Sequence, residues 1–373
     1  MSQIAKALNT IQWIPAYFWQ VASRSHPKAR PVHVVLSLAD HFEPSILPGG
    51  GEQHADRAEQ ERRTETWCLR YPEVVEKWRD RDGRPFRHTY FYPAEQYEKN
   101  VVERLAEHCR AGWGELEIQL HHGLEAPDTP ARTRQTIIDF RDRLAALGCL
   151  SRVDGSGPIR YGFVHGNWAL ANSNSGRACG VDDEMQILAE TGCYGDFTLP
   201  SAPNPAQVRK INALYECAMP LDQRAPHRRG RDLARGRMVE RYPLIVQGPL
   251  LFRWTRPGKR GLAPYIENSA LTTANPPTLQ RLALWMKANI RVVGRPEWIF
   301  VKLHCHGMDP RDEAAMLGSS MTRFLSELRE AEETGALCFY FTTAREMVNM
   351  MLAACDGREG SPGEYRDYRL RIK

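Results

Sequence analysis

Short apolar runs alternate with segments of helical period along this chain, and that alternation limits its fold more than any other feature. Eight runs are rich in Val, Ile, Phe and Tyr, the composition typical of strands. They are Val32–Asp40, Arg87–Pro93, Glu115–His121, Arg160–His165, Cys193–Leu199, Leu244–Phe252, Trp298–His304 and Leu337–Thr342. Amphipathic segments between them predict helices at Glu95–Ala111, Thr129–Leu147, Asp182–Glu190, Thr278–Ile290 and Arg345–Ala354.

Strands that alternate with helices imply parallel pairing through right-handed crossovers. We therefore expect an α/β fold, a distorted parallel (β/α) barrel of seven or eight strands over residues 30–355. A doubly wound open sheet is the alternative, but no glycine-rich phosphate loop follows the first strand. Residues 1–29 form an aromatic, amphipathic N-terminal segment, and the polar, basic residues 356–373 are expected to be a surface tail.

Composition excludes several classes of protein. The net charge of +5 is modest for 373 residues; it permits an anionic substrate but does not indicate nucleic acid. The nine cysteines contain no C-x-x-C pair, so we expect reduced, buried thiols in a cytoplasmic protein. No run is long and apolar enough to span a membrane. The segment Ile11–Ala22 predicts a helix packed on the outside of the domain, or alternatively a weak attachment to a membrane surface, such as the inner membrane.

Histidines gather where predicted strands end. Six of the twelve follow or close a strand: His41, His121, His122, His165, His304 and His306. In a parallel β/α barrel those ends form one face, which carries the active site. A carboxylate such as Asp40 together with His121 would suit zinc, cobalt, iron or manganese.

The triplet His304-Cys305-His306 lies at the end of one such strand. Side chains two apart in a strand share a face, so both imidazoles can point into the mouth of the barrel while Cys305 packs outward. Either imidazole could act as a general acid. This alternation argues against Cys305 as a nucleophile.

The order of these motifs resembles the polysaccharide deacetylases, the nodulation-type carbohydrate esterases, over roughly residues 30–345. Their first strand ends in Thr-Phe-Asp-Asp, and Ser37-Leu38-Ala39-Asp40 stands in its place here. The resemblance implies that Asp40 binds a divalent metal, most simply zinc. Ala39 replaces the aspartate that is the catalytic base in that family, so His41, Glu43 or Asp196 would have to take this role.

The family's second motif is a histidine followed four residues later by another. His121 matches the first, and the second falls on Glu125, with His122 as an adjacent substitute. The resemblance thus implies a metal held by Asp40, His121 and either His122 or Glu125. The late histidine of the family matches His304 or His306, and the register leaves both open as the acid.

The family's Arg-x-Pro-Tyr motif is missing, and His165-Gly166-Asn167-Trp168 follows the fourth strand instead. We expect His165, Asn167 and Trp168 to contact substrate, with Trp168 either stacking on a sugar or packing in the pocket wall. Seven arginines crowd residues 224–241, either as a solvated loop or as a rim that attracts an acidic glycan.

The leading hypothesis is a metal-dependent hydrolase that removes acetyl groups from a surface polysaccharide or a glycan precursor. A glycoside hydrolase using two carboxylates, Glu43 and Asp196, is a second hypothesis. A glycan-binding or assembly protein that has lost its catalytic base is a third.

Overall fold

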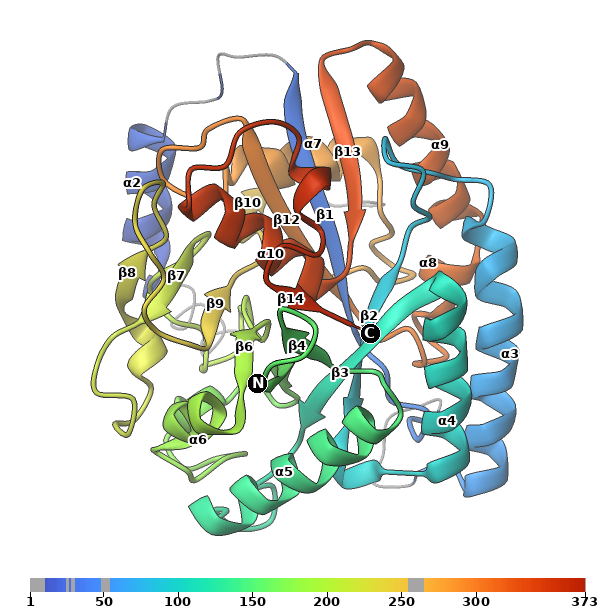
Figure 1. The fold of residues 1–373 in the computed structure, drawn as a ribbon, viewed down its shortest axis with the longest axis vertical. Helices are drawn as coiled ribbons and strands as arrows, with labels where there is room; N and C mark the ends of the chain where they lie inside the picture. The colour runs from blue at the N-terminus through green and yellow to red at the C-terminus, as the bar shows by residue number, and fades with distance from the viewer. Residues whose placement is uncertain (1–10, 25–26, 28–30, 48–53, 254–264, 373) are drawn as a thin grey trace.

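A computed structural model describes residues 11–24, 27, 31–47, 54–253 and 265–372 of the chain. Its centre is a large, mostly parallel sheet in the order β12-β1-β2-β3-β5-β6-β9-β7-β8 (Figure 1). The parallel strands are β1 (Val32–His41), β2 (His88–Pro93), β3 (Gly114–Leu120), β5 (Ile159–His165), β6 (Cys193–Asp196), β9 (Leu244–Val246), β12 (Trp298–Cys305) and β13 (Leu337–Thr342). The expected α/β class is confirmed, and each predicted strand is present, with Leu244–Phe252 divided between β9 and the start of β10.

Shorter antiparallel strands extend this framework. The strands β7 (Leu214–Cys217) and β8 (Gly230–Asp232) continue the sheet beyond β9, and β4 (Ser151–Val153) pairs with β5. The strands β10 (Leu251–Arg253) and β11 (Tyr265–Glu267) form a separate hairpin pair.

No ladder joins β12 to β8 within the described ranges, so closure of the sheet into a barrel is not observed. The free side of β12 is occupied instead by a short irregular segment. The N–H of Leu271 donates to the carbonyl of His304, and the N–H of His304 donates to the carbonyl of Ser269. The segment pairs with β12 through an isolated parallel bridge between Ala270 and His304.

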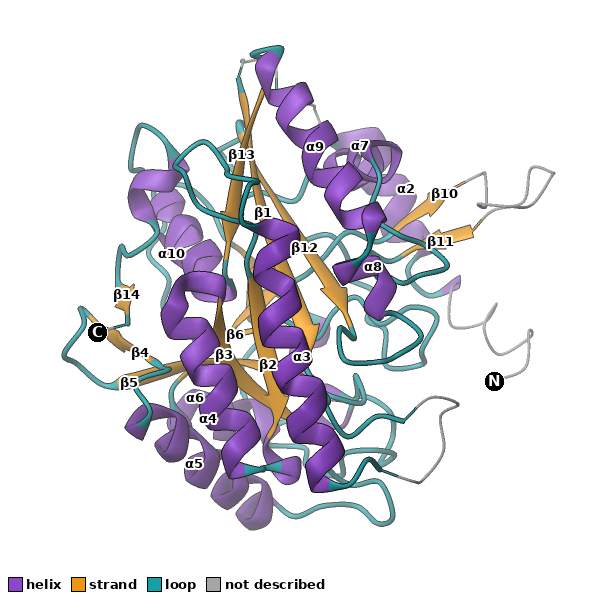
Figure 2. Ribbon diagram, turned by 90° about the vertical axis from the view of Figure 1, so that its right-hand side faces the viewer, coloured by secondary structure: helices purple, strands orange, loops and turns teal. Residues whose placement is uncertain are grey.

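Helices pack on both faces of the sheet. Figure 2 shows α3 and α4 side by side across β1, β2 and β3. The helices are α2 (Ile14–Ser23), α3 (Arg57–Val75), α4 (Lys99–His108), α5 (Pro130–Ala146), α6 (Glu184–Thr191), α7 (Leu279–Lys287), α8 (Glu313–Leu317), α9 (Ser319–Glu333) and α10 (Ala344–Cys355). The predicted helix at Thr129 begins as expected, because the Thr129 hydroxyl caps α5 and Pro130 follows it. The sequence did not predict α3, whose buried face includes the polar Gln60 and Thr64 and so weakens the apolar period.

The side chains of β1 alternate between two faces, and this alternation positions the functional site. Val34, Leu36 and Leu38 point to the outer face, in the core shared with Trp67 of α3. Val35 and Ala39 point to the inner face, in a second core that includes most of α10. The residues that follow at the end of β1 continue this pattern.

The N-terminal helix packs on the outside of the domain, as one of the two sequence interpretations predicted. Trp13 is fully buried and stacks on Phe252 with 4.8 Å between ring centroids. Phe18 and Trp19 are 61% and 73% exposed. None of the helices in the described part of the chain combines the length and apolarity that a membrane span requires.

Residues 356–372 are docked rather than forming the expected surface tail. The strand β14 (Leu370–Arg371) pairs with β4. The guanidinium of Arg366 is buried and lies 2.6 Å from a carboxylate oxygen of Asp80 and 3.3 Å from one of Glu346. The segment's basic residues indicated a solvated tail, but one of them, Arg366, instead neutralises buried carboxylates.

Candidate functional site

The carboxyl ends of β1, β3 and β12 lie at one edge of the sheet, because the three strands are parallel and Asp40 is level with Cys305. Inner-face side chains from these ends converge there. We call His41, Glu43, His121 and His306 the Glu43 cluster. It unites three of the histidines that the sequence singled out with a carboxylate that the sequence offered as a base.

Glu43 is the hub of this cluster. Its Oε1 lies 3.0 Å from Nε2 of His121 and accepts a 2.7 Å hydrogen bond from Gln119. Its Oε2 lies 2.8 Å from Nδ1 of His306, whose ring is 4.6 Å from that of His41 between centroids. The Glu43 side chain is 6% exposed and that of His306 is 28% exposed, so the cluster is buried on one side and open to solvent on the other.

Electrostatics divides the cluster into charged and neutral groups. Burial opposes ionisation of Glu43, but the charge of His306 and hydrogen bonds from His121 and His306 hold the pKa of this carboxyl well below its usual range. Burial also opposes the charged form of His306, but Glu43 raises its pKa. Burial, with His306 nearby, lowers the pKa of His41 well below its ordinary value. His41 therefore presents a neutral imidazole beside an anionic carboxylate.

A second carboxylate orients His121. Nδ1 of His121 lies 2.7 Å from Oε1 of Glu95, which follows the end of β2. Burial lowers the pKa of His121, but hydrogen bonds to Glu43 and Glu95 outweigh burial and raise it to about 10. The ring packs directly on Gly166, where an added Cβ would lie 2.3 Å from it. Glycine at that position is therefore needed for the imidazole to occupy its place.

Three groups in this cluster could share one metal ion. One donor atom each from His41, Glu43 and His306 lie within 4.8 Å of one another. Nδ1 of His41 is buried and has no hydrogen-bond partner, and the same is true of Nδ1 of the neighbouring His304. Imidazole and carboxylate donors suit zinc and related divalent ions, so these residues fit such an ion.

Asp40 lies elsewhere, and the expected pairing of Asp40 with His121 does not occur. It points to the outer face, where its Oδ2 is 2.9 Å from Nδ1 of His88 and its Oδ1 accepts a 2.7 Å hydrogen bond from the N–H of Gly307. Strand alternation is the reason, since position 40 faces α3 while positions 41 and 43 face inward. Cys305 points to the same outer face, as its sequence position predicted.

Asp196 and Lys302 are two ionisable residues buried on the inner face. Asp196 accepts a 2.8 Å hydrogen bond from the Thr198 hydroxyl, and burial raises the pKa of this carboxyl to about 7. Burial lowers the pKa of Lys302 to about 7, and its Nζ donates to the carbonyl of Phe197. Asp196 is thus held by neighbours of β6 and is not a member of the Glu43 cluster.

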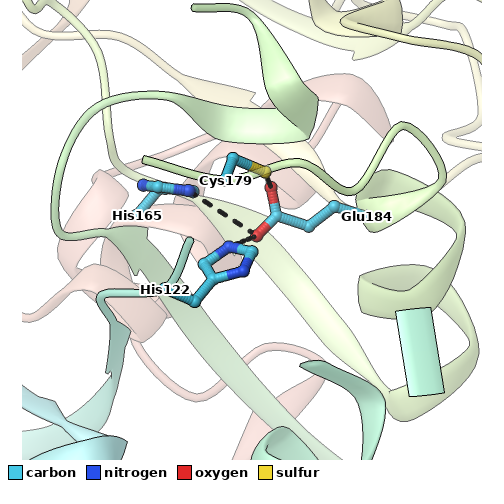
Figure 3. Close-up of side chains that lie close together, drawn as sticks. All are labelled: His122, His165, Cys179 and Glu184. Atoms are coloured by element: carbon cyan, nitrogen blue, oxygen red, sulfur yellow. Dashed lines mark hydrogen bonds and ion pairs between the residues drawn. The ribbon is translucent and has the colours of Figure 1, made fainter. Parts of the chain in front are cut away.

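His122 turns away from its neighbour His121 and joins a separate group. We call His122, His165, Cys179 and Glu184 the His165 cluster (Figure 3). Nε2 of His122 lies 3.0 Å from Oε1 of Glu184, and Nε2 of His165 lies 4.0 Å from the same oxygen. All four residues are buried.

The other predicted site residues lie around these two clusters. Glu125 is exposed on the loop after β3 and lines a pocket of about 400 Å³ together with Glu95 and His121. The backbone N–H of Asn167 lies 3.3 Å from Nδ1 of His165. Trp168 is half-buried and has a left-handed backbone, with φ of 61°.

The arginines of residues 224–241 bind largely within the chain. Arg224 and Arg228 donate to the carbonyls of Asn172 and Ser173, which fastens the loop after β5. Arg231 pairs with Glu216. His227, between these arginines in sequence, is fully buried, and neither of its ring nitrogens has a hydrogen-bond partner.

Four residues of the two clusters and their surroundings were not among the predicted site residues: Glu95, Gln119, Cys179 and Glu184. Glu95 follows the end of β2, and Gln119 lies near the end of β3, so the strand-end rule could have found both. Cys179 lies in a loop and Glu184 begins α6, and no strand-end pattern marks them.

Neither the scan against protein-family models nor the search of curated proteins finds a match for this chain. Its chemistry is therefore inferred from the two clusters and their surroundings.

Proposed function

We propose that this protein is a metal-dependent hydrolase that removes acetyl groups from a glycan or polysaccharide precursor. The observation that carries the proposal is the Glu43 cluster. It combines the buried carboxylate of Glu43, the unpartnered Nδ1 of His41, and the solvent-facing His121, which Glu95 orients. That combination supplies both a metal-binding set and an acid–base group.

His41, Glu43 and His306 would hold the ion, with zinc the simplest candidate and cobalt, iron or manganese suitable alternatives. When bound, such an ion polarises an acyl carbonyl and lowers the pKa of water. Gln119 keeps Glu43 in place by donating to its Oε1. The enclosed inner side of the cluster excludes water, and the solvent-facing side admits substrate.

His121 would transfer the proton. Glu95 holds Nδ1, which fixes the ring and leaves Nε2 directed at the centre of the cluster. Because Glu43 and Glu95 raise its pKa to about 10, His121 is protonated, and Nε2 would donate its proton to the departing nitrogen or oxygen of the sugar. Glu43, whose Oε1 lies 3.0 Å from Nε2, would accept the proton of the attacking water and return it to His121, in place of the base that Ala39 cannot provide.

The neighbouring pocket supports a polar substrate. It is lined by carboxylates, His121 and Arg132 beside short apolar side chains, a mixture that suits a sugar with an acyl substituent. We extend the proposal to a distorted β/α barrel, which the parallel strands and their shared functional edge favour. The nine free thiols favour a reducing cytoplasm, and exposed Phe18 and Trp19 favour weak contact with a membrane surface.

Glycoside hydrolysis has less support from the same residues. Glu43 is held by Gln119, His121 and His306, and Asp196 is fully buried against Thr198. Neither carboxyl group is free to face a sugar ring from opposite sides, which that chemistry requires.

The test measures acetate and new reducing ends released from acetylated oligosaccharides by the full-length, zinc-loaded protein. His121→Ala should lower acetate release by about 10²-fold or more, the usual contribution of a general acid–base group. Glu98→Gln is the matched control, because Glu98 is partly exposed, contacts Arg57 and lies outside the cluster. New reducing ends without acetate would favour glycoside hydrolysis. Bound zinc with neither product would favour a binding protein.

A further inference from the structure

The His165 cluster differs from the Glu43 cluster in being closed. His165, Cys179 and Glu184 are fully buried, and His122 is 7% exposed. The four side chains come from separate places: the end of β3, the end of β5, the following loop and the start of α6 (Figure 3). Structural zinc sites have four protein ligands and no open position, whereas catalytic sites keep a position for water.

The spacing of the donor atoms suits one tetrahedral ion. Ligand bonds of zinc place neighbouring donor atoms about 3.3–3.8 Å apart. Oε1 of Glu184 lies 3.0 Å from Nε2 of His122 and 4.0 Å from Nε2 of His165, and the four donor atoms lie within 4.8 Å of one another. Nε2 of His165 is buried without a hydrogen-bond partner and points toward Glu184. An ion bound at Nε2 of His165 would require the ring proton to sit on Nδ1. Nδ1 could then no longer accept the 3.3 Å hydrogen bond from the N–H of Asn167, and this contact would open.

The groups behind the donor atoms already hold them in the required directions. Nδ1 of His122 lies 3.1 Å from Asp128, the carboxylate–histidine arrangement common behind zinc ligands. The N–H of Ala171 donates to Oε2 of Glu184 at 2.6 Å, which leaves Oε1 to face the cluster. The N–H of Asn172 lies 3.3 Å from Sγ of Cys179.

Charge balance favours a divalent cation at this place. A carboxylate and a thiolate together carry two negative charges, which a divalent ion neutralises within the buried space. Without a cation, Glu184 depends on contacts from His122, the Ala171 N–H and the Cys179 thiol for its stabilisation.

We propose that His122, His165, Cys179 and Glu184 bind a structural zinc ion that fastens the loop after β5 to the sheet. Such an anchor would hold the unfavourable backbone of this loop, because five of its non-glycine residues have left-handed φ angles. They are Trp168, Ala171, Asn172, Ser175 and Ala178. The anchored loop begins at Gly166, which packs on His121, so the ion would also support the geometry of the Glu43 cluster.

A third group, Asp40, His88 and Cys305, offers a matched comparison. Both oxygens of Asp40 already bond to His88 and to the N–H of Gly307, and the group contributes only three donors. We therefore assign it no ion. Cys305 is as buried as Cys179 and serves as the control thiol.

The test is a titration of the chelator-stripped, full-length protein with Co²⁺ alone. A cobalt–thiolate bond gives an intense near-ultraviolet absorption that imidazole and carboxylate ligands do not give, and the Glu43 cluster contains no cysteine. We expect this absorption in the wild type and in Cys305→Ser, and its loss in Cys179→Ser. Absence of the absorption from the wild type, or its survival in Cys179→Ser, would overturn the proposal.

Zinc-edge X-ray absorption of the wild type keeps the test decisive if Cys179→Ser does not fold. A sulfur ligand at about 2.3 Å is expected, and a spectrum with nitrogen and oxygen ligands alone would contradict the closed site. The two proposals fail separately. His41→Ala should abolish acetate release and keep the cobalt–thiolate absorption. A wild type that is fully active but shows no such absorption would contradict the structural ion alone and leave the proposed function standing.

Discussion

Glu117 should make the unfolding free energy depend steeply on pH, and Glu117→Gln should remove this residue's share of that dependence. This residue lies on the inner face of β3 and is 1% exposed. It accepts 2.6 Å hydrogen bonds from the Tyr194 hydroxyl and the N–H of Gly162. Burial raises the pKa of the carboxyl to about 8, only partly opposed by these two hydrogen bonds.

The size of the effect follows from the two states of the carboxyl. Between its ordinary pKa of 4.5 and the folded value of about 8, the unfolded chain is ionised while the folded protein keeps the proton. The folded state then binds one more proton, so the unfolding free energy falls by about 1.4 kcal/mol per pH unit as pH rises. The full loss approaches about 5 kcal/mol near pH 8 and then levels off. The neutral glutamine avoids this loss at a constant cost of about 1 kcal/mol for a weakened hydrogen bond.

Urea unfolding of the wild type and Glu117→Gln between about pH 5 and about pH 8 measures the difference. The stability of the variant relative to the wild type should rise steadily with pH. Glu125→Gln is the control, because it removes an exposed carboxyl by the same substitution. A constant difference between Glu117→Gln and wild type would refute the raised pKa.

Three further variants test other parts of the molecule. Arg366→Met leaves the buried Asp80 without its guanidinium partner, whereas Glu346 keeps Arg87, and should cost about 3–5 kcal/mol in thermal or urea unfolding. An unchanged melting temperature would contradict the docked C-terminus. Gly166→Ala places a Cβ against the ring of His121 and should lower acetate release at least about tenfold while the cobalt–thiolate absorption stays, and an unchanged rate would argue against His121. Trp19→Ser should weaken binding to lipid vesicles without changing the melting temperature, because Trp19 is 73% exposed; equal vesicle binding would remove α2 as the attachment.

The strands and the functional edge could be predicted from the sequence because both depend on local patterns. The predicted strand Val32–Asp40 differs from β1 by one residue, and the Thr129 cap begins α5 as expected. The strand-end histidines of β1, β3 and β12 meet because parallel strands end at the same edge. This rule needs only the period of the sequence and the direction of the strands.

The face of the strand on which each side chain lies could not be predicted so directly. Asp40 matched a family motif, but a motif does not state which face of β1 the residue occupies, and the strand turns it toward α3. His121 and His122 are adjacent in sequence and therefore enter different clusters. Cys179 and Glu184 reach the His165 cluster through a loop with left-handed residues, and sequence periodicity carries no information about such a path.

The most direct test of the central claim is the rate of acetate release from acetylated oligosaccharides by the full-length protein in three states. The rate is measured in the zinc-loaded protein, after chelation and after zinc is returned. The Glu43 cluster predicts release in the first state, loss in the second and recovery in the third. A rate that chelation leaves unchanged, or zinc-loaded protein that releases no acetate from any acetylated oligosaccharide, would contradict a metal-dependent deacetylase.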